Sequence, residues 1–553
     1  MLKPPPTAPR AYRTHPLGVM NPNRHCVYLL KGRCVTRKAA GSAVLEGSPA
    51  LTHNPCVGKG LKPCRADQEK YLMLSILVGH SYFLRLDPKQ LERAKPYPPL
   101  ATLQVAALLR EGGHRVAFFD AMLAPGMAEY EAQLAGAPQV VVLYEDNFNF
   151  LSKMCLAAVR AACCEMIGAA RRRGARVIVA GSDVTDAPEA YLRAGAEVAL
   201  LGEGLAALAA LLRRLDADVQ VSTAQLTREL TGVAYLDGER LRRVSEGRAT
   251  EVVGYPDLPA WDLIDIERYR AVWVKAHGYF SLNMAASRGC PFRCTWCAKP
   301  IWGNQYSQRS AAAVASEFIH LKRQFNPDHI WFADDIFGFR PAWVGQFARL
   351  VREAQALTPF TIQIRADLTT EAMAQALSGA GCAEAWIGAE SGSQRILDAM
   401  NKGTTVAEIL TARARLKAQG IRVGFFIQLG YLDEQLTDIL ATRELLEAAR
   451  PDDVGVSVSY PLPGTKFYEL VKEQLNGKTH WQDSGDLAMM FRGTYSSEFY
   501  RAIRNLLHEQ VSVGQLDAAG HAERYHQAKR RLARRWAALQ SSESHFRVAR
   551  ALG

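Results

Sequence analysis

The segment Arg288-Gly-Cys-Pro-Phe-Arg-Cys-Thr-Trp-Cys297 carries three cysteines at the spacing C-x3-C-x2-C, directly after a predicted β-strand. Thiolates are soft ligands, so a short loop with three of them favours an iron–sulfur cluster or zinc. Three ligands are one fewer than a closed structural site uses, which leaves a metal position open for a small molecule. The segment therefore indicates a catalytic iron–sulfur site, with a zinc site or three packed thiols as alternatives.

Six β-rich segments alternate with helical stretches around and after these cysteines. They are YFSLNMAAS (279–287), HIWFADDIF (329–337), FTIQIRADL (360–368), EAWIGAES (384–391), RVGFFIQLG (422–430) and DDVGVSVSY (452–460). This alternation predicts right-handed βαβ units and a parallel sheet. Because a complete eight-fold barrel needs about 250 residues, six repeats predict an open, partial (β/α)6 barrel.

A second alternating series precedes the first. Its strands are MLSILVGH (73–80), HRVAFFD (114–120), QVVVLYED (139–146), ARVIVAGSD (175–183) and EVALLGEG (197–204), and its helices are expected at 100–113, 151–174 and 205–215. The series predicts a doubly wound, Rossmann-like α/β domain. A hairpin with Asp237-Gly238 as its turn follows, and PDLPAWDLID (256–265) marks a boundary.

These patterns divide the chain into five predicted parts. They are a disordered basic extension (1–72), an N-terminal domain (73–250), a linker (251–275), the barrel (276–480) and a helical C-terminal region (481–553). The extension holds nine prolines and no sustained periodicity, which is typical of a segment that cannot bury enough surface to become ordered.

The formal charge of +12 is concentrated at the two ends of the chain. Residues 1–72 contribute +9 and residues 521–553 contribute +6, which leaves −3 for the rest. The near-neutral body argues against nucleic-acid binding. The sequence contains no stretch of about 18 uncharged apolar residues, so it predicts no membrane span. Its N-terminus lacks the apolar region of a secretory signal. We therefore expect a cytoplasmic protein, in which eleven cysteines favour metal or redox chemistry over disulfides.

The cysteine segment resembles the radical S-adenosylmethionine (SAM) superfamily. The superfamily motif C-x3-C-x-aromatic-C is matched by Cys290, Cys294, Trp296 and Cys297. The resemblance implies a 4Fe-4S cluster held by the three cysteines, with SAM on the open iron and Trp296 beside it. It also implies a reductant such as flavodoxin or ferredoxin, whose electron allows SAM to yield a 5′-deoxyadenosyl radical that removes a hydrogen from the substrate.

Further segments match the superfamily in order along the barrel. The resemblance places Asp334 and Asp335 near the methionyl end of SAM, Glu390 and Ser391 near its ribose, and YPLPGTKFYE (460–469) at the sixth strand. Many relatives have Gly-x-Pro-Gly-Glu at the fifth strand, where Leu429-Gly-Tyr-Leu-Asp433 stands here. A single acidic residue at a strand end is more often a cap or a salt-bridge partner. The prediction of SAM binding therefore depends on the order in which these residues follow the cysteine motif.

The N-terminal domain resembles the cobalamin-binding domains of the same superfamily. The matching residues are Leu100 and Thr102 in Pro98-Pro-Leu-Ala-Thr102, Asp120, Gly181, Ser182, Asp183, Gly202, Glu203 and Gly204. Glycines at strand ends allow a flat ligand to approach the backbone, although one such turn is ordinarily structural. The Asp-x-His-x-x-Gly motif of other cobalamin proteins is absent, so we expect base-off cobalamin without a histidine ligand.

Other residues have simpler interpretations. Asn147, Phe148 and Asn149 end a strand and would face the corrin, with core packing as the alternative. Cys155, Cys163, Cys164 and Cys382 are expected to be small buried side chains. Cys26, Cys34, Cys56 and Cys64 have no metal-ligand spacing and are expected to be unpaired thiols in the extension.

The combined features predict a cobalamin-dependent radical SAM enzyme. The preferred reaction transfers a methyl group from methylcobalamin to an unactivated carbon, or phosphorus, of a small molecule. The alternative enzyme is an oxidative cyclase like the anaerobic magnesium-protoporphyrin IX monomethyl ester cyclase. Methylthio transfer to tRNA is disfavoured, because no second cysteine-rich domain precedes the core. A non-catalytic cobalamin or redox sensor is the alternative of another class, and such a sensor needs no SAM site.

Overall fold

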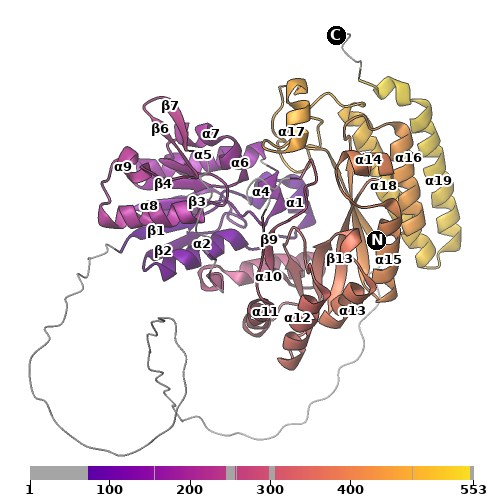
Figure 1. Ribbon diagram of the computed structural model, residues 1–553, viewed down its shortest axis with the longest axis horizontal. Coiled ribbons are helices and arrows are strands. Elements are labelled where there is room, and N and C mark those ends of the chain that lie inside the picture. Colours follow the sequence, from indigo (N-terminus) through magenta and orange to yellow (C-terminus); the bar gives the residue numbers. More distant parts are fainter. Residues whose placement is uncertain are drawn as a thin grey trace, which may run out of the picture. The chain divides into compact units, whose positions relative to one another are not determined.

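The structure is a computed structural model that describes residues 73–548 apart from 155, 245–253, 255, 257, 298–304 and 476. The described chain forms two mainly parallel α/β sheets and then a pair of long helices (Figure 1). This confirms the predicted fold class. The predicted extension 1–72, with its four cysteines, lies outside the described residues, as does Cys155. None of the described helices combines the length and apolar character needed to cross a bilayer.

The N-terminal sheet has the strand order β2-β1-β3-β4-β5-β6-β7. Its strands are β1 (Ser75–Gly79), β2 (Arg115–Phe119), β3 (Val140–Tyr144), β4 (Arg176–Ala180), β5 (Val198–Leu200), β6 (Val233–Asp237) and β7 (Arg240–Val244). The first five are parallel, and the order reverses between β1 and β3. Open α/β sheets bind ligands at the carboxyl edge beside such a reversal.

The hairpin at the end of this sheet turns one residue later than predicted. Asp237 pairs with Arg240 in the ladder, so the turn is Gly238-Glu239 and not Asp237-Gly238. Gly238 has a φ of 61°, which glycine adopts without strain.

Nine helices of the described residues accompany this sheet along the chain. They are α1 (Pro88–Arg93), α2 (Leu100–Glu111), α3 (Met127–Leu134), α4 (Phe150–Lys153), α5 (Ala157–Arg172), α6 (Ser182–Asp186), α7 (Pro188–Arg193), α8 (Leu205–Ala217) and α9 (Thr223–Thr227). The single helix predicted over 151–174 is divided into α4 and α5.

Part of the predicted linker 251–275 is helical. Helix α10 (Ile266–His277) begins at Asp265, whose carboxylate accepts the Glu267 N–H. Its Trp273 is buried and donates from Nε1 to the Pro96 carbonyl at 2.7 Å. The helix therefore belongs to the packed structure, because its apolar side meets the segment before α2.

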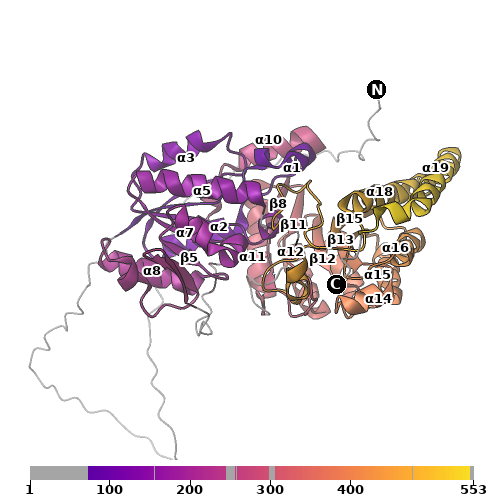
Figure 2. The same ribbon diagram turned by 90° about the horizontal axis from the view of Figure 1, so that it is seen from above.

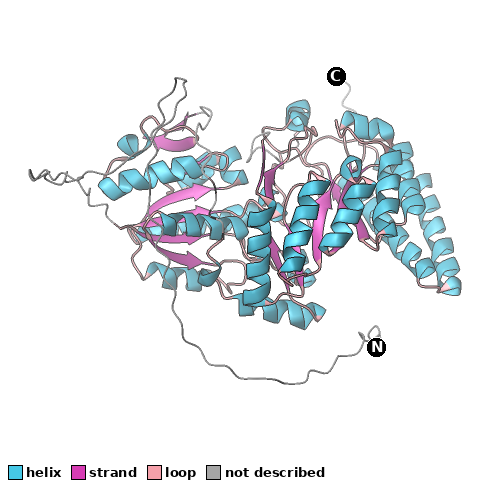
Figure 3. Cartoon of the chain, turned by 60° about the horizontal axis from the view of Figure 1, so that its bottom comes forward, coloured by secondary structure: helices cyan, strands magenta, loops and turns pink. Residues whose placement is uncertain are grey.

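The second sheet has six parallel strands in the order β15-β14-β13-β12-β11-β8 and is open, as predicted (Figure 3). The strands are β8 (Ser281–Met284), β11 (His329–Phe332), β12 (Phe360–Ile364), β13 (Cys382–Glu390), β14 (Arg422–Leu429) and β15 (Asp453–Val458). Its helices are α11 (Ala311–Phe325), α12 (Pro341–Glu353), α13 (Glu371–Ala380), α14 (Gln394–Ala399), α15 (Val406–Ala418), α16 (Leu436–Ala449) and α17 (Lys466–Val471). Successive long helices pack side by side along the sheet (Figure 2).

The C-terminal region is a helical pair, as predicted. Helices α18 (Ser497–Ala518) and α19 (Ala522–Ser541) pack on each other, and α18 also contacts β15 and α16. The buried residues of α19 are Leu532 and Trp536, which form its apolar side. The basic residues of α19 are largely exposed, so this helix has a solvated basic face.

Candidate functional site

The cysteine segment begins where β9 (Ser287–Gly289) ends, and β9 pairs with β10 (Tyr306–Gln308). Cys290 is buried, and Cys294 and Cys297 are half-buried. Within the described residues no three Cys, His, Asp or Glu side chains are already arranged around a metal position. One loop thus supplies three soft donors, the donor set that suits an iron–sulfur cluster, and cluster binding by these cysteines stays a prediction.

Thr295 fixes this loop to the later half of the barrel. Its N–H and hydroxyl both donate to the Met400 carbonyl, at 2.9 and 3.1 Å. The hydroxyl also lies 2.7 Å from the Tyr431 hydroxyl, and the Thr295 carbonyl accepts the Phe467 N–H at 2.9 Å. These bonds hold the cysteine segment at the carboxyl ends of the strands.

Two cationic side chains lie beside the loop. Arg365 stacks 3.7 Å from the Phe292 ring centroid and places Nη1 3.8 Å from the Cys294 sulfur. Lys402 is buried and forms a 2.7 Å ion pair with Glu390, which has a φ of 61° at the end of β13. Burial opposes the charged form of Lys402, but Glu390 and Cys294 outweigh it and raise the pKa of the ammonium. Arg365 and Lys402 thus place positive charge beside the Cys294 sulfur.

The two predicted acids after β11 have different partners. Asp334 is fully buried and accepts hydrogen bonds from the Ala286 N–H and the Ser287 hydroxyl. Burial raises the pKa of Asp334 to about 7. Asp335 forms an ion pair with Lys153 of α4. Asp334 thus supports the strand that enters the cysteine loop, and contact of either acid with SAM stays a prediction.

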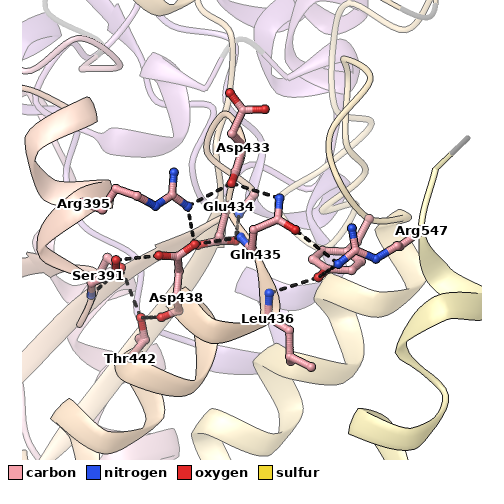
Figure 4. Close-up of polar contacts among 12 residues, drawn as sticks. Ser391, Arg395, Asp433, Glu434, Gln435, Leu436, Asp438, Thr442 and Arg547 are labelled. Carbon is pink, nitrogen blue, oxygen red and sulfur yellow. Dashed lines mark hydrogen bonds and ion pairs between the residues drawn. The ribbon is translucent and has the colours of Figure 1, made fainter. Parts of the chain in front are cut away.

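Ser391 belongs to a buried polar network with α16 (Figure 4). Its hydroxyl lies 3.2 Å from that of Thr442 and accepts the Ser393 N–H. Asp438 accepts the Ser393 hydroxyl at 2.6 Å and forms an ion pair with Arg395. Since Ser391 is fully buried, this network fixes the turn after β13, and its predicted contact with the SAM ribose stays untested.

The segment after β14 is more similar to the superfamily pattern than its sequence indicates. Gly430 has a φ of 73° and donates its N–H to Glu434 at 2.7 Å, and Asp433 has a φ of 56°. Read from Gly430, the segment keeps the first glycine and the final glutamate of Gly-x-Pro-Gly-Glu, and Asp433 takes the backbone conformation that favours glycine. Sequence reasoning missed Glu434 because the comparison began one residue early.

The carboxyl ends of the two sheets face each other. Glu203, which follows β5, forms an ion pair with Arg288, two residues before Cys290. Lys153 and Asp335 form a second link at 2.5 Å. The two ion pairs therefore join the sheet edge that is predicted to bind cobalamin to the sheet edge that is predicted to bind SAM.

The glycines after β4 and β5 meet the chain's own packing. A Cβ atom on Gly181 would lie 2.9 Å from the Glu145 side chain, and one on Gly204 would lie 2.6 Å from the Leu200 Cβ. Gly202 has a φ of 69°. Protein packing and backbone conformation thus account for glycine at these positions, and contact of these residues with cobalamin stays a prediction.

Asp183 has four bonds to other side chains. Its carboxylate accepts two 2.6 Å bonds from Arg160, one from Tyr191 and one from His480. Burial alone would raise the pKa of Asp183, but these bonds hold it well below its usual value. The residue fastens α5 and α6 to the segment that follows α17, and sequence reasoning did not foresee this role.

The remaining predicted cobalamin residues lie in or beside packed helices. Leu100 and Thr102 are fully buried in α2, and the Thr102 hydroxyl donates to the Tyr144 carbonyl at 2.8 Å. Ser182 is the first residue of α6. Their direct contact with cobalamin stays a prediction.

The edge at the β1/β3 reversal brings the predicted residues Asp120 and Asn147 together with His80, which sequence reasoning did not single out. His80 is buried with Nε2 3.1 Å from Asp120, which also accepts the Tyr269 hydroxyl. The Asn147 amide is fully buried, and neither its nitrogen nor its oxygen has a hydrogen-bond partner among the described residues. The sequence could have indicated His80 as a site residue, because this histidine is the last residue of a predicted strand.

Of the remaining cysteines, Cys163 and Cys382 are buried as expected, and Cys164 is half-buried.

A cavity of about 1680 Å³ joins the two sheets. From the first sheet it reaches Met122, Asp146 and Asn149, which follow β2 and β3. From the barrel it is lined by side chains of all six strands, including Asn283, Trp331, Gln363, Trp386, Gln428 and Ser457. Trp296 also lines it, and its buried Nε1 has no partner among the described residues. A volume above the usual range of about 300–1,000 Å³ for small-molecule sites, together with unpartnered polar atoms, fits a site for large cofactors.

Comparison with known proteins identifies the class. Residues 284–446 match the family described as the Radical SAM superfamily. An uncharacterized methyltransferase of Pyrococcus horikoshii is 24% identical over 67% of this chain and 78% of its own length. The anaerobic magnesium-protoporphyrin IX monomethyl ester cyclase of Cereibacter sphaeroides is 25% identical over 50% of this chain and 45% of that enzyme.

A solved structure shares the fold over most of the chain. The radical SAM methyltransferase TsrM from Kitasatospora setae, solved with cobalamin and a 4Fe-4S cluster, is 18% identical and covers 73% of this chain and 75% of its own, with a TM-score of 0.57. Residues 284–446 therefore form a radical SAM domain. The chain has the fold of the cobalamin-dependent members of the radical SAM superfamily.

Proposed function

We propose that this enzyme uses cobalamin and SAM to transfer a methyl group to an unactivated carbon, or phosphorus, of a small molecule. One observation carries the proposal. The reversal edge of the N-terminal sheet and the cysteine-bearing edge of the barrel open onto one cavity of about 1680 Å³. Two large cofactors and a substrate have to meet in such a space for a methyl group to pass between them.

The cofactors would be held by residues of both edges. Cys290, Cys294 and Cys297 would ligate a 4Fe-4S cluster, and the carboxyl edge between β1 and β5 would hold cobalamin. When bound, the cluster would supply the electron that cleaves SAM, and cobalamin would supply the methyl group. The chain's own residues would stabilise the thiolates through Arg365 and Lys402.

The interacting edges would also exclude water from the reaction. The Arg288–Glu203 and Lys153–Asp335 ion pairs link the two sheets beside the cavity. Exclusion of water protects a reactive radical from side reactions. We further propose that the enzyme works in the cytoplasm with flavodoxin or ferredoxin as reductant, and that its parts follow the boundaries 73–250, 251–275, 276–480 and 481–553.

Product analysis tests the reaction type. The anaerobically reconstituted chain is incubated with reductant, SAM carrying a deuterated methyl group, and a small-molecule extract. A product with a deuterated methyl group, formed together with S-adenosylhomocysteine and 5′-deoxyadenosine, is expected. Formation of 5′-deoxyadenosine with a dehydrogenated or cyclised product and no label would instead support a cyclase, the reaction of the Cereibacter sphaeroides relative.

Cobalt coordination tests the cobalamin site separately. We propose base-off cobalamin without a histidine ligand, because His80 at the reversal edge is buried against Asp120. The cob(II) spectrum should lack nitrogen hyperfine splitting on the axial signal. Such a splitting, lost in His80→Ala, would overturn this part of the proposal and leave the cluster site intact.

A further inference from the structure

One end of the cavity carries a group of basic side chains, here called the cationic end. Lys89 and Arg93 come from α1, and Arg504 and His508 come from α18. All four line the same cavity, although more than 400 residues of sequence separate the two helices. The fold thus gathers basic groups from two distant elements beside one ligand space.

These cations lack carboxylate partners. Within the described residues, Lys89, Arg93 and Arg504 form no ion pair: Lys89 donates to the Ser484 carbonyl at 3.2 Å, and Arg504 donates to the neighbouring Asn505 side chain. The adjacent acid Asp87 already accepts bonds from Ser484, Tyr82 and the Gln90 N–H. Positive charge at the cationic end is therefore incompletely compensated.

The pKa values of two of these groups are lowered by burial and by the neighbouring positive charges. Burial lowers the pKa of Lys89, and the nearby Arg93 and Arg504 lower it further, against the opposing effect of Asp87 and Asp483. Burial and Arg504 likewise lower the pKa of His508, with smaller contributions from Lys89 and Arg93, while Asp453 acts in the opposite direction. Lys89 and His508 thus each lie close enough to both arginines to be repelled by them, and an anion among these groups would relieve the repulsion.

Aromatic side chains line the cavity beside the cationic end. Tyr97 lies 5.2 Å from Trp273 and 4.8 Å from Trp331 between ring centroids, and Trp386 stacks on Phe426 at 4.8 Å. All five rings line the cavity. Such walls bind flat apolar or conjugated groups through their faces.

We propose that the substrate is a flat apolar or conjugated molecule with an anionic oxygen group, either carboxylate or phosphate, and that Lys89, Arg93 and Arg504 bind this group. The aromatic walls would hold its body in the barrel. This inference rests on the proposed function, since it names the substrate class of the same cavity. Arginine and lysine placed around a ligand space are the usual donors to carboxylate and phosphate oxygens.

A pair of probes that differ only in charge tests the inference without the reaction. Pyrenebutyrate and its neutral analogue pyrenebutanol are titrated into the full chain, and energy transfer from the cavity tryptophans to pyrene reports binding. Pyrenebutyrate should bind more tightly, and Arg93→Gln or Arg504→Gln should weaken its binding about tenfold, because a hydrogen bond to a charged group is lost. Binding of pyrenebutanol should not change.

The controls separate the possible outcomes. Arg530→Gln and Arg534→Gln on the exposed side of α19 remove the same charge elsewhere and should leave both probes unaffected. Competition by inorganic phosphate but not acetate would assign the anion as phosphate, and the reverse as carboxylate. Equal binding of both probes, or equal loss in the α19 variants, would overturn the inference. Failure of the proposed function would appear instead in the wild-type chain, as absent methyl transfer with normal probe binding.

Discussion

The Lys402–Glu390 pair provides a quantitative test of the site's construction. The Nζ and Oε1 atoms are 2.7 Å apart, and the two side chains are only 7% and 5% exposed. Lys402→Met keeps most of the side chain's volume but leaves the Glu390 carboxylate buried without its cation. Removal of one partner from a buried pair costs about 3–5 kcal/mol of stability, so we expect a loss of that size in the free energy of unfolding.

The double variant Lys402→Met/Glu390→Gln should recover part of this loss. It removes the buried charge and leaves only an imperfectly bonded neutral amide, which costs about 1–3 kcal/mol. Urea titrations of the two single variants and the double variant complete the cycle. Lys472→Met breaks the exposed pair with Glu469 and serves as the control, with no resolvable change expected. A Lys402→Met variant as stable as this control would refute the reasoning.

Two further predictions concern stability. Burial raises the pKa of the Glu434 carboxyl to about 8. Between the ordinary pKa of a glutamate and about pH 8, the folded chain therefore keeps a proton that the unfolded chain loses, and the free energy of unfolding falls as pH rises through that interval. Glu434→Gln should remove this pH dependence. Urea titrations at pH 5 and pH 8 measure the effect, and a variant-to-wild-type difference independent of pH would contradict it. Gly204→Ala should cost at least about 1 kcal/mol more than Gly238→Ala, because both have a positive φ but only Gly204 has a side chain within 3 Å of the new Cβ. Equal losses in thermal unfolding would show that the contact with Leu200 is relieved at no cost.

The sequence predicted the features that depend on periodicity. Alternating strands and helices identified both sheets, and the short count of βα repeats predicted an open barrel, because hydrophobic patterning reports which faces are buried. The pattern did not indicate α10, because a boundary rich in proline and aspartate precedes the helix and only three of its twelve residues, Ile266, Tyr269 and Trp273, are buried.

The contacts between distant segments were beyond sequence reasoning. The Asp183–His480 bond and the Arg288–Glu203 ion pair join residues far apart in the chain, and a single sequence has no signal for such pairing. The cationic end was missed for the same reason, because Lys89 and Arg504 come together only in the fold. The cysteine spacing could be recognised because all of its residues lie in one short loop.

The central claim is that Cys290, Cys294 and Cys297 hold a cluster that cleaves SAM. The direct measurement is iron content and 5′-deoxyadenosine formation after anaerobic reconstitution, for wild type, each Cys→Ala variant and Cys164→Ala as a half-buried cysteine outside the loop. We predict about four iron atoms per chain and SAM cleavage in wild type and Cys164→Ala, and loss of SAM cleavage in each loop variant. Zinc in place of iron, or a loop variant that still cleaves SAM at the wild-type rate, would contradict the claim.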